Sequence, residues 1–283
     1  MVNEISQEKA KIICDMEQHL KSDLLFSKQE KLWEHALIKM QIDKRNKKDK
    51  FCVKDHIRAM VYSMLSAGRK WDCIVTGAGI TTGYLKSVDE IFYDYNSQQL
   101  LKCTPKQLRE SLKEIHCASR YTFKQMDALI SVNIPKLIEL KEKYGTIDNY
   151  YDMFMQKDET LITLVKALSE PKSKDKMAQL GVALASEYLR NIGYDIPKPD
   201  RHICRILGSD YLAFSSKKNV PPIEVFEIIR GLAEKLNKSV AEVDYILWSY
   251  CADGYGEICT KKDSKCTKCV AKAHCNRYSC LNM

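Results

Sequence analysis

Several features that define other classes of protein are missing from this sequence of 283 residues. No apolar run approaches the roughly 20 residues that a membrane-spanning helix needs, and no internal repeat recurs along the chain. Residues 1–20 lack the apolar segment of a secretory signal, so we expect a cytoplasmic protein, associated with the nucleoid if the source is bacterial. No alternating pattern is long enough to predict a strand. These absences argue against membrane, exported, repeat and β proteins.

The composition is that of a folded protein with a modest basic surplus. Apolar residues make up 45% of the chain and charged residues 29%, which allows one large or two modest domains with a real core. Lys and Arg number 45 and Asp and Glu 37, a net charge of +8. This surplus is compatible with a polyanionic partner but does not demonstrate one. Twelve cysteines without an export signal indicate a reducing compartment.

Helical periodicity runs through most of the chain. Apolar residues recur at helical spacing in residues 1–43, which contain no Pro or Gly. Residues 55–68 form an apolar segment, for which Asp55 is the expected N-cap and Gly68 the C-terminal stop. Thr104 is the expected N-cap of another helix, because a proline occupies the first helical position after it. The sequence therefore predicts an all-α fold.

A strongly basic segment follows the first helices. Residues 44–50 carry five Lys or Arg in seven positions. We interpret this segment as a solvated linker, and the alternative is an arm that contacts phosphates.

Four cysteines are concentrated near the C-terminus. Cys259, Cys266, Cys269 and Cys275 lie within 17 residues, with the spacing C-x6-C-x2-C-x5-C. Thiols this dense in a basic loop indicate a metal centre. Structural zinc sites usually take their ligands as two close pairs, and this loop has only one. The spacing favours a [4Fe–4S] cluster with one thiolate per iron, and zinc is the alternative. The other cysteines are interpreted as buried thiols rather than ligands. Cys280 lies close to the loop, so both interpretations are kept for it.

The cysteine spacing resembles the iron–sulfur loop of DNA glycosylases of the endonuclease III and adenine-mismatch glycosylase type, within the helix-hairpin-helix superfamily. The four positions match that family without insertion or deletion. The resemblance implies a [4Fe–4S] cofactor, a monomer that binds double-stranded DNA and no membrane, and a two-lobed all-α fold. A helical barrel would span residues 54–194, and residues 195–283 would form the iron–sulfur lobe with the helices of residues 1–53 packed on it. DNA would lie between the lobes, with the target base flipped out of the duplex.

A second resemblance lies in the hairpin motif, whose family pattern is Leu-Pro-Gly-x-Gly-x-x-x-Ala. Gly181 and Ala185 match the second glycine and the alanine, whereas Gln179 replaces the first glycine. The lyase lysine of bifunctional members lies two residues after the second glycine, and Ala183 stands there. The resemblance thus implies a monofunctional glycosylase that uses water. Lyase activity through a relocated lysine is a less favoured alternative.

Several expected DNA contacts also follow from the resemblance. The stretch of residues 64–67 is similar to a family helix that ends in Leu-Leu-Ser-Ala-Gln, whose Gln enters the DNA stack. Gly68 stands in place of that Gln, so Arg69 or Trp71 is the candidate to fill the gap. The backbone N–H groups at Gly181 are expected to reach a phosphate. Further phosphate contacts are expected from three lysines of the cysteine loop, Lys261, Lys262 and Lys265.

The remaining stretch resembles the family's Val-Asp-x-His-x-x-Arg, with Asp200, His202 and Arg205 matching. The resemblance implies that Asp200 is the catalytic carboxylate. A fixed carboxylate stabilises the positive charge that develops on the deoxyribose and can orient or deprotonate water. The alternative is that Asp200 only caps a helix. We expect His202 to support the loop around it and Arg205 to donate hydrogen bonds at the edge of the core.

The sequence favours a DNA repair glycosylase that excises a damaged or mispaired base. The main alternative is a non-catalytic iron–sulfur protein that binds lesions or unusual DNA structures. The changes at the hairpin, lysine and wedge positions favour the alternative, and Asp200 opposes it. The sequence does not identify the base, because pocket shape decides specificity.

Overall fold

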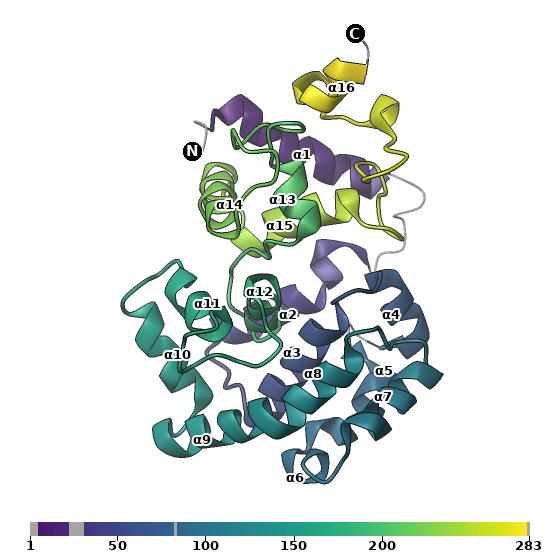
Figure 1. Cartoon of the computed structure of the whole chain (residues 1–283). Coiled ribbons are helices and arrows are strands. Elements are labelled where there is room, and N and C mark those ends of the chain that lie inside the picture. The colour runs from purple at the N-terminus through teal and green to yellow at the C-terminus, as the bar shows by residue number, and fades with distance from the viewer. Residues whose placement is uncertain (1–4, 23–30, 82–83, 282–283) are drawn as a thin grey trace. The chain divides into compact units, whose positions relative to one another are not determined.

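The computed structural model describes residues 5–22, 31–81 and 84–281, and its regular structure is almost entirely helical (Figure 1). The all-α prediction is confirmed. The strands of the described residues are β1 (Ile80–Thr81) and β2 (Tyr84–Leu85), which pair antiparallel. Two-residue strands are too short to leave an alternating pattern in the sequence. Among the helices of these residues, none is both long and apolar enough to cross a membrane.

The chain divides into two compact units. One contains Met1–Lys39 together with Asp195–Met283, and we call it the two-segment unit. The other contains Met40–Tyr194, and we call it the continuous unit. The sequence predicts domain boundaries after residues 53 and 194. In the structure the chain passes from one unit to the other after Lys39 and again after Tyr194.

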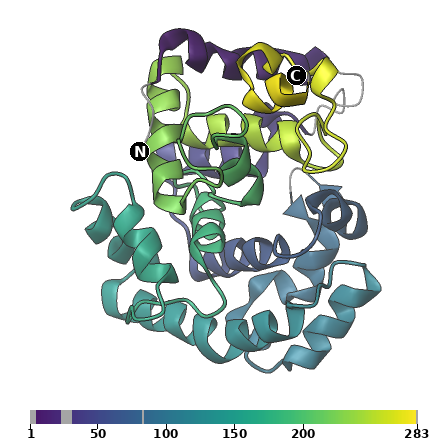
Figure 2. The same ribbon diagram turned by 45° about the horizontal axis from the view of Figure 1, so that its top comes forward.

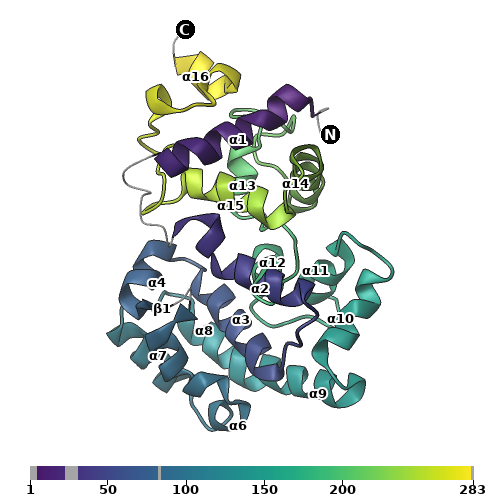
Figure 3. The same cartoon turned by 180° about the vertical axis from the view of Figure 1, so that it is seen from behind.

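The two-segment unit is built around one long N-terminal helix and two later ones. Its helices are α1 (Gln7–Ser22), η2 (Trp33–His35), α13 (Arg201–Ile206), α14 (Pro222–Leu236), α15 (Val240–Cys251), η5 (Cys266–Lys268), η6 (Lys272–His274) and α16 (Asn276–Leu281). Helix α1 packs along α14 and α15, although more than 200 positions separate them in the sequence, as in the pair Gln7 and Lys235 (Figures 1 and 3). Burial of Ile13 and Met16 on α1 and of Leu247 on α15 stabilises this packing.

The continuous unit is organised around α3, which is buried along most of its length. Its helices are α2 (Leu37–Asn46), which begins just before the boundary, α3 (Val53–Leu65), α4 (Trp71–Ala78), α5 (Lys86–Ile91), η3 (Tyr93–Tyr95), α6 (Ser97–Leu100), α7 (Pro105–Glu114), α8 (Thr122–Ala128), η4 (Leu129–Asn133), α9 (Ile134–Tyr144), α10 (Ile147–Met155), α11 (Ile162–Ser169) and α12 (Val182–Arg190). Helix α3 packs against α12, where Ser63 Oγ donates to the Leu184 carbonyl at 2.6 Å and His56 Nδ1 lies 2.7 Å from the Tyr188 hydroxyl. These bonds hold α12 in the core.

Residues 40–53 belong to the continuous unit, which corrects the expectation that they pack on the cysteine-bearing lobe. Arg45 Nη2 donates to Asp148 Oδ1 at 2.9 Å, and Arg45 Nε donates to the Ile192 carbonyl at 2.8 Å. Lys44 and Arg45 also lie over the ring of buried Phe51. The first two residues of the basic segment therefore contribute to packing, while the lysines at 47, 48 and 50 are exposed.

The helix ends show which local signals were interpreted correctly. Thr104 accepts a hydrogen bond from the Gln107 backbone at 3.2 Å, as expected for the N-cap of α7. Asp55 is not an N-cap. Cys52 takes that position, and Asp55 accepts a bond from the Cys52 backbone N–H at 2.9 Å. This back-bond is the carboxylate half of a capping box, which places an acid three residues after the cap.

Candidate functional site

Asp200 follows a linker that is fixed to α15. The Asp195 carboxylate accepts from the backbone N–H groups of Val240 and Ala241 at 3.1 and 2.7 Å. The Lys198 backbone N–H donates to Asp244 Oδ1 at 3.0 Å, and Asp244 is buried. Asp195 and Lys198 thus each bond to α15, so this helix holds the segment that leads to Asp200.

The Asp200 side chain caps α13. Its Oδ1 accepts from the backbone N–H groups of His202 at 2.8 Å and Ile203 at 3.1 Å. Within the described residues no hydrogen bond ends on Oδ2, and the side chain is half-buried. One oxygen therefore anchors the acid, and the other is available to a partner.

His202 and Arg205 lie on the same short helix, α13. Burial lowers the pKa of His202, which favours the neutral ring. Arg205 Nη2 donates to the Cys259 carbonyl, and its guanidinium lies 5.5 Å from the centre of the Tyr211 ring. Arg205 thus connects the helix that Asp200 caps to the first cysteine of the loop.

The four cysteines of the loop are half-buried free thiols. A hydrogen bond from Cys251, opposed by burial and assisted by the charge of Arg205, lowers the pKa of Cys259 to about 7. Arg277 contributes a further positive charge to this lowering. Thiolate is the form that binds metals, so Cys259 has the electrostatic setting of a ligand.

The other cysteines of the loop lie close enough to influence one another. Burial raises the pKa of Cys269 and Cys275, and the negative charge of Cys259 raises both further. The charge of Cys266 also acts on Cys275. Burial also raises the pKa of Tyr250, and the charge of Cys269 adds to this effect. Cys259, Cys269 and Cys275 therefore lie close enough for a charge on one to act on the others.

The donor set fits an iron–sulfur cluster in composition. Across residues 5–22, 31–81 and 84–281, no three His, Cys, Asp or Glu side chains are grouped so as to hold a single metal ion. This finding agrees with the mutual influence of the cysteines, since charge repulsion acts over longer distances than coordination. The cluster remains a prediction.

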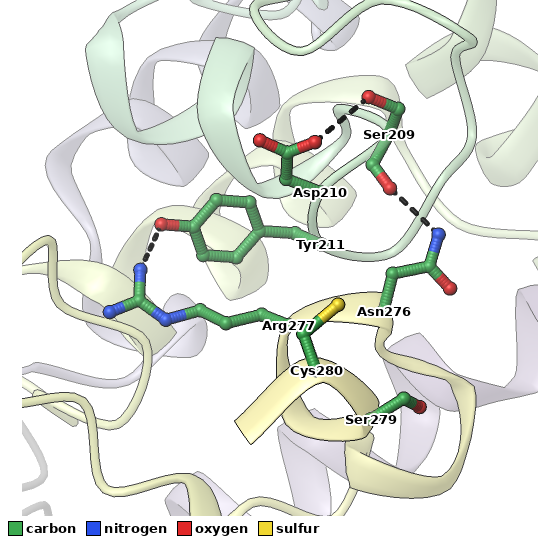
Figure 4. A pocket seen from close by; sticks show the side chains of 7 residues that line it. All are labelled: Ser209, Asp210, Tyr211, Asn276, Arg277, Ser279 and Cys280. Carbon is green, nitrogen blue, oxygen red and sulfur yellow. Dashed lines mark hydrogen bonds between the residues drawn. The ribbon is translucent and has the colours of Figure 1, made fainter. Parts of the chain in front are cut away.

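A pocket of about 560 Å³ opens beside the cysteine loop (Figure 4). Arg277 donates to the Tyr211 hydroxyl, and Asn276 Nδ2 donates to the Ser209 carbonyl at 2.7 Å. These bonds tie α16 to the turn that follows α13. Cys280 lines this pocket with an exposed thiol.

The hairpin turn has a non-glycine residue in a left-handed backbone conformation. The chain between α11 and α12 is a loop without regular structure (Figure 2). Gln179 adopts φ +61°, the left-handed conformation that favours glycine. Gly181 caps α12 with φ −87°, and a Cβ added there would meet no atom within 4 Å. The backbone at Gly181 is therefore open to an approaching group.

Three side chains hold this loop in place. Asn133 bonds in both directions to the Ala178 backbone, accepting at 2.7 Å and donating at 3.0 Å. Lys136 donates to the Lys174 carbonyl at 2.6 Å. Lys176 Nζ donates to the Ser169 carbonyl at 2.8 Å and to the Leu180 carbonyl. Asn133 ends the π-helical turn η4, and such turns often occur at functional sites.

The position of the lyase lysine has no amine. Ala183 lies in the first turn of α12 and is half-buried. Burial lowers the pKa of Lys176, a property of nucleophilic lysines. Its ammonium nevertheless donates to two carbonyls inside the loop, so Lys176 has a structural role in this conformation.

An exposed aromatic side chain covers the glycine at the wedge position. Gly68 has φ +76°, and a Cβ there would approach Tyr121 Cε2 to 2.8 Å. Arg69 donates to the carbonyls of Ala118, at 3.2 Å, and His116, so it braces this loop. Tyr121 is 38% exposed. Arg69 was the residue expected from the sequence, and Tyr121 was not, because Gly68 and Tyr121 lie 53 positions apart (121 minus 68).

Neighbours of Tyr121 give the surface a mixed aromatic and basic character. Phe123 is 49% exposed, and Arg120 and Lys124 are also exposed. The guanidinium of Arg120 lies 4.7 Å from the centre of the Tyr121 ring. Trp71, the other candidate, begins α4 and is half-buried. Aromatic faces beside cations are suited to stacking with nucleobases.

The loop lysines differ in their availability. Lys261 and Lys262 are exposed, whereas Lys265 Nζ lies 3.6 Å from Glu257 Oε2. An exposed ion pair of this kind is weak. All three lysines could therefore contact phosphates, and their role stays a prediction.

The comparisons with known proteins agree with a glycosylase but do not identify the type. No family model matches the chain. A stretch of 116 residues, 40% of the chain, is 29% identical to the 8-oxoguanine DNA glycosylase/AP lyase of Aquifex aeolicus. The chain spans about half the length of that curated relative, 50%. The name of this relative is that of a DNA glycosylase and does not point to the endonuclease III type in particular.

Two solved structures of an 8-oxoguanine glycosylase from Methanocaldococcus jannaschii are similar to the chain. One is a complex with DNA containing 8-oxoguanine; it is 18% identical, covers 84% of this chain and 96% of its own, and has a TM-score of 0.49. The other is 20% identical, covers 85% and 94%, and has a TM-score of 0.46.

Proposed function

We propose that this protein is a DNA glycosylase that releases a damaged or mispaired base from duplex DNA by hydrolysis. The observation that carries the proposal is the geometry of Asp200. One carboxylate oxygen is held by two backbone N–H groups, and the other is uncommitted among the described residues. The similarity to a curated 8-oxoguanine glycosylase supports the same class of reaction.

The reaction needs one fixed acid and a water molecule. Breaking the N-glycosidic bond transfers its electron pair to the base and leaves positive charge on the sugar. The Asp200 carboxylate stabilises that charge and accepts a proton from the attacking water, whose oxygen bonds to C1′. The departing base takes up a proton, so the products are a free base and an abasic site.

We infer that the protein acts without lyase chemistry. Schiff-base formation needs an unprotonated amine next to C1′, and Ala183 stands at the position where the resemblance expects one. The curated relative carries AP lyase in its name, so this chain would differ from it in mechanism. Among the lysines of the loop, Lys176 is a candidate for a relocated amine because burial lowers its pKa, and its two carbonyl partners argue against that role.

We further propose a [4Fe–4S] cluster held by Cys259, Cys266, Cys269 and Cys275. Their chemistry and half-burial, and the electrostatic influence of Cys259 on Cys269 and Cys275, support the proposal. When bound, such a cluster supplies a rigid cross-link for the loop and a one-electron redox centre. The bond from Arg205 to the Cys259 carbonyl would couple the ordered loop to the helix that Asp200 caps.

The decisive experiment measures base release from a panel of lesion-bearing duplexes, including 8-oxoguanine, with alkali to reveal abasic sites. Asp200→Asn separates the two roles of the acid, because asparagine caps helices about as well as aspartate but carries no charge. We expect the variant to lose about 100-fold or more in rate while its thermal unfolding stays near that of the wild type. The matched control is Asp210→Asn, which alters an exposed carboxylate and should leave release unchanged.

A second candidate function is a non-catalytic protein that binds DNA lesions or structures. The departures at Gly68, Gln179 and Ala183 favour it. Equal DNA binding by the wild type and Asp200→Asn, with no base released from any duplex, would replace the catalytic proposal with this one.

A further inference from the structure

The last turn of α15 brings two polar side chains to the cysteine loop. Tyr250 is fully buried, and its hydroxyl lies 3.7 Å from Cys269 Sγ. Cys251, the next residue, is also fully buried, and it lowers the pKa of Cys259. Consecutive positions on a helix point about 100° apart, so these two residues act on different cysteines. Helix α15 thus contacts the loop through the Tyr250 hydroxyl.

The Tyr250 hydroxyl has three neighbours, and one placement of its proton satisfies all of them. The Val270 backbone N–H donates to the hydroxyl at 3.2 Å, and His19 Nδ1 lies 2.9 Å away. A hydroxyl has one proton to donate and two lone pairs. If His19 Nδ1 carries hydrogen, the oxygen accepts from His19 and Val270 and donates to Cys269 Sγ. The opposite tautomer would direct the hydroxyl proton to His19 and away from sulfur.

We propose that Tyr250 donates a hydrogen bond to the Cys269 thiolate and thereby raises the reduction potential of the iron–sulfur cluster. This inference rests on the proposed cofactor. Reduction adds negative charge to the cluster and its sulfurs, and a hydrogen-bond donor stabilises the more negative state. Helix α1 takes part through His19, which orients the hydroxyl from the other end of the chain.

The test is a redox titration of the purified full chain followed by electron paramagnetic resonance. Iron and sulfide are measured first in each variant. We expect Tyr250→Phe to shift the reduction equilibrium about three- to tenfold toward the oxidised state, where tenfold equals about 59 mV for one electron. Tyr245→Phe is the matched control, because it removes a hydroxyl of the same helix that bonds to the Lys31 carbonyl at 3.0 Å. Its potential should equal that of the wild type.

A second variant tests the placement of the proton. We expect His19→Ala to leave the potential unchanged or slightly lower, because the hydroxyl proton already points at sulfur. A clear rise in His19→Ala would mean that the proton was held by histidine, and this would overturn the inference.

Two further outcomes distinguish this inference from the proposals beneath it. An unchanged potential in Tyr250→Phe, with iron and sulfide content equal to the wild type, overturns the role of Tyr250 and leaves the cluster intact. A colourless wild type without iron or sulfide overturns the cluster and the inference together. Base release is measured separately, so the glycosylase proposal stands or falls on its own assay.

Discussion

The hairpin loop and the Asp200 segment resemble the same family in different ways, one in backbone conformation and the other in residue identity. At the hairpin the family's residues are partly lost, yet Gln179 keeps the left-handed backbone that a glycine would supply. At the Asp200 segment the residues are kept, and Asp200 and Arg205 make contacts that join a helix N-terminus to the cysteine loop. The likeness lies in backbone conformation at the hairpin and in side-chain identity at the Asp200 segment.

The difference teaches that a turn can be specified by its surroundings. Asn133, Lys136 and Lys176 bond to backbone groups of the hairpin loop, so the turn does not depend on its own glycines. A catalytic carboxylate has no such substitute, because only a charged oxygen stabilises the developing cation. Ala183 offers no amine, and it lies in the first turn of α12.

The largest expected effect comes from restoring the missing amine. Ala183→Lys places a lysine in the first turn of α12, where the family resemblance puts the lyase nucleophile. We expect covalent trapping on lesion-bearing duplex by borohydride to rise from background to a clear band, because only a Schiff base is reduced to a stable adduct. Trapping in the wild type that disappears in Lys176→Met would instead identify Lys176 as a relocated nucleophile.

The next effect tests whether the hairpin loop depends on the two hydrogen bonds that Lys176 donates to backbone carbonyls. Lys176→Met removes two charge-assisted bonds to carbonyls, each worth about 1.5–3 kcal/mol in protein interiors. Since Lys176 is half-exposed, we expect a loss of about 2 kcal/mol in the free energy of unfolding, together with weaker DNA binding. Lys172→Met is the control in the same loop, because Lys172 is exposed. Equal denaturation midpoints for the two variants would show that the Lys176 hydrogen bonds do not stabilise the loop.

The smallest effect concerns strain in the turn. Gln179→Gly relieves a left-handed conformation that costs a non-glycine residue about 1 kcal/mol, partly offset by the greater freedom of glycine in the unfolded chain. We expect a gain of about 0.5 kcal/mol in the free energy of unfolding by urea denaturation. Gly181→Ala should change stability little, because φ there is −87° and nothing lies near the added Cβ. A destabilised Gln179→Gly would show that the glutamine side chain contributes contacts of its own.

Much of the fold was predictable because its signals are local. The N-cap at Thr104 and the cap of α13 by Asp200 depend on residues two or three positions apart, so the sequence displays both partners. Asp55 was predicted to be the N-cap of α3, whereas it is the third residue of the capping box. The two roles are easily confused, because an acid is typical of both positions. Such errors move a boundary by a few residues and leave the element in place.

The contacts of the candidate site were less predictable. The hydrogen bond between Asn133 and Ala178 joins residues 45 positions apart, and the one between Tyr250 and His19 joins residues 231 positions apart. Neither asparagine in a helix nor tyrosine at a helix end has a spacing that indicates such a partner. The same holds for Tyr121 over Gly68, where the sequence shows only an aromatic residue and a glycine far from it.

By itself the sequence determined the helical class, the dense thiols of the cysteine loop, the acid at position 200 and the absence of a lysine at position 183, because composition and short spacings are properties of the chain. Only the tertiary structure decided that Lys176 binds carbonyls, that Tyr250 meets Cys269 and that residues 40–53 pack in the continuous unit. The physical reason is that these contacts form only when separate helices pack. Packing is driven by the burial of apolar faces, and the polar residues that then form hydrogen bonds do not decide it.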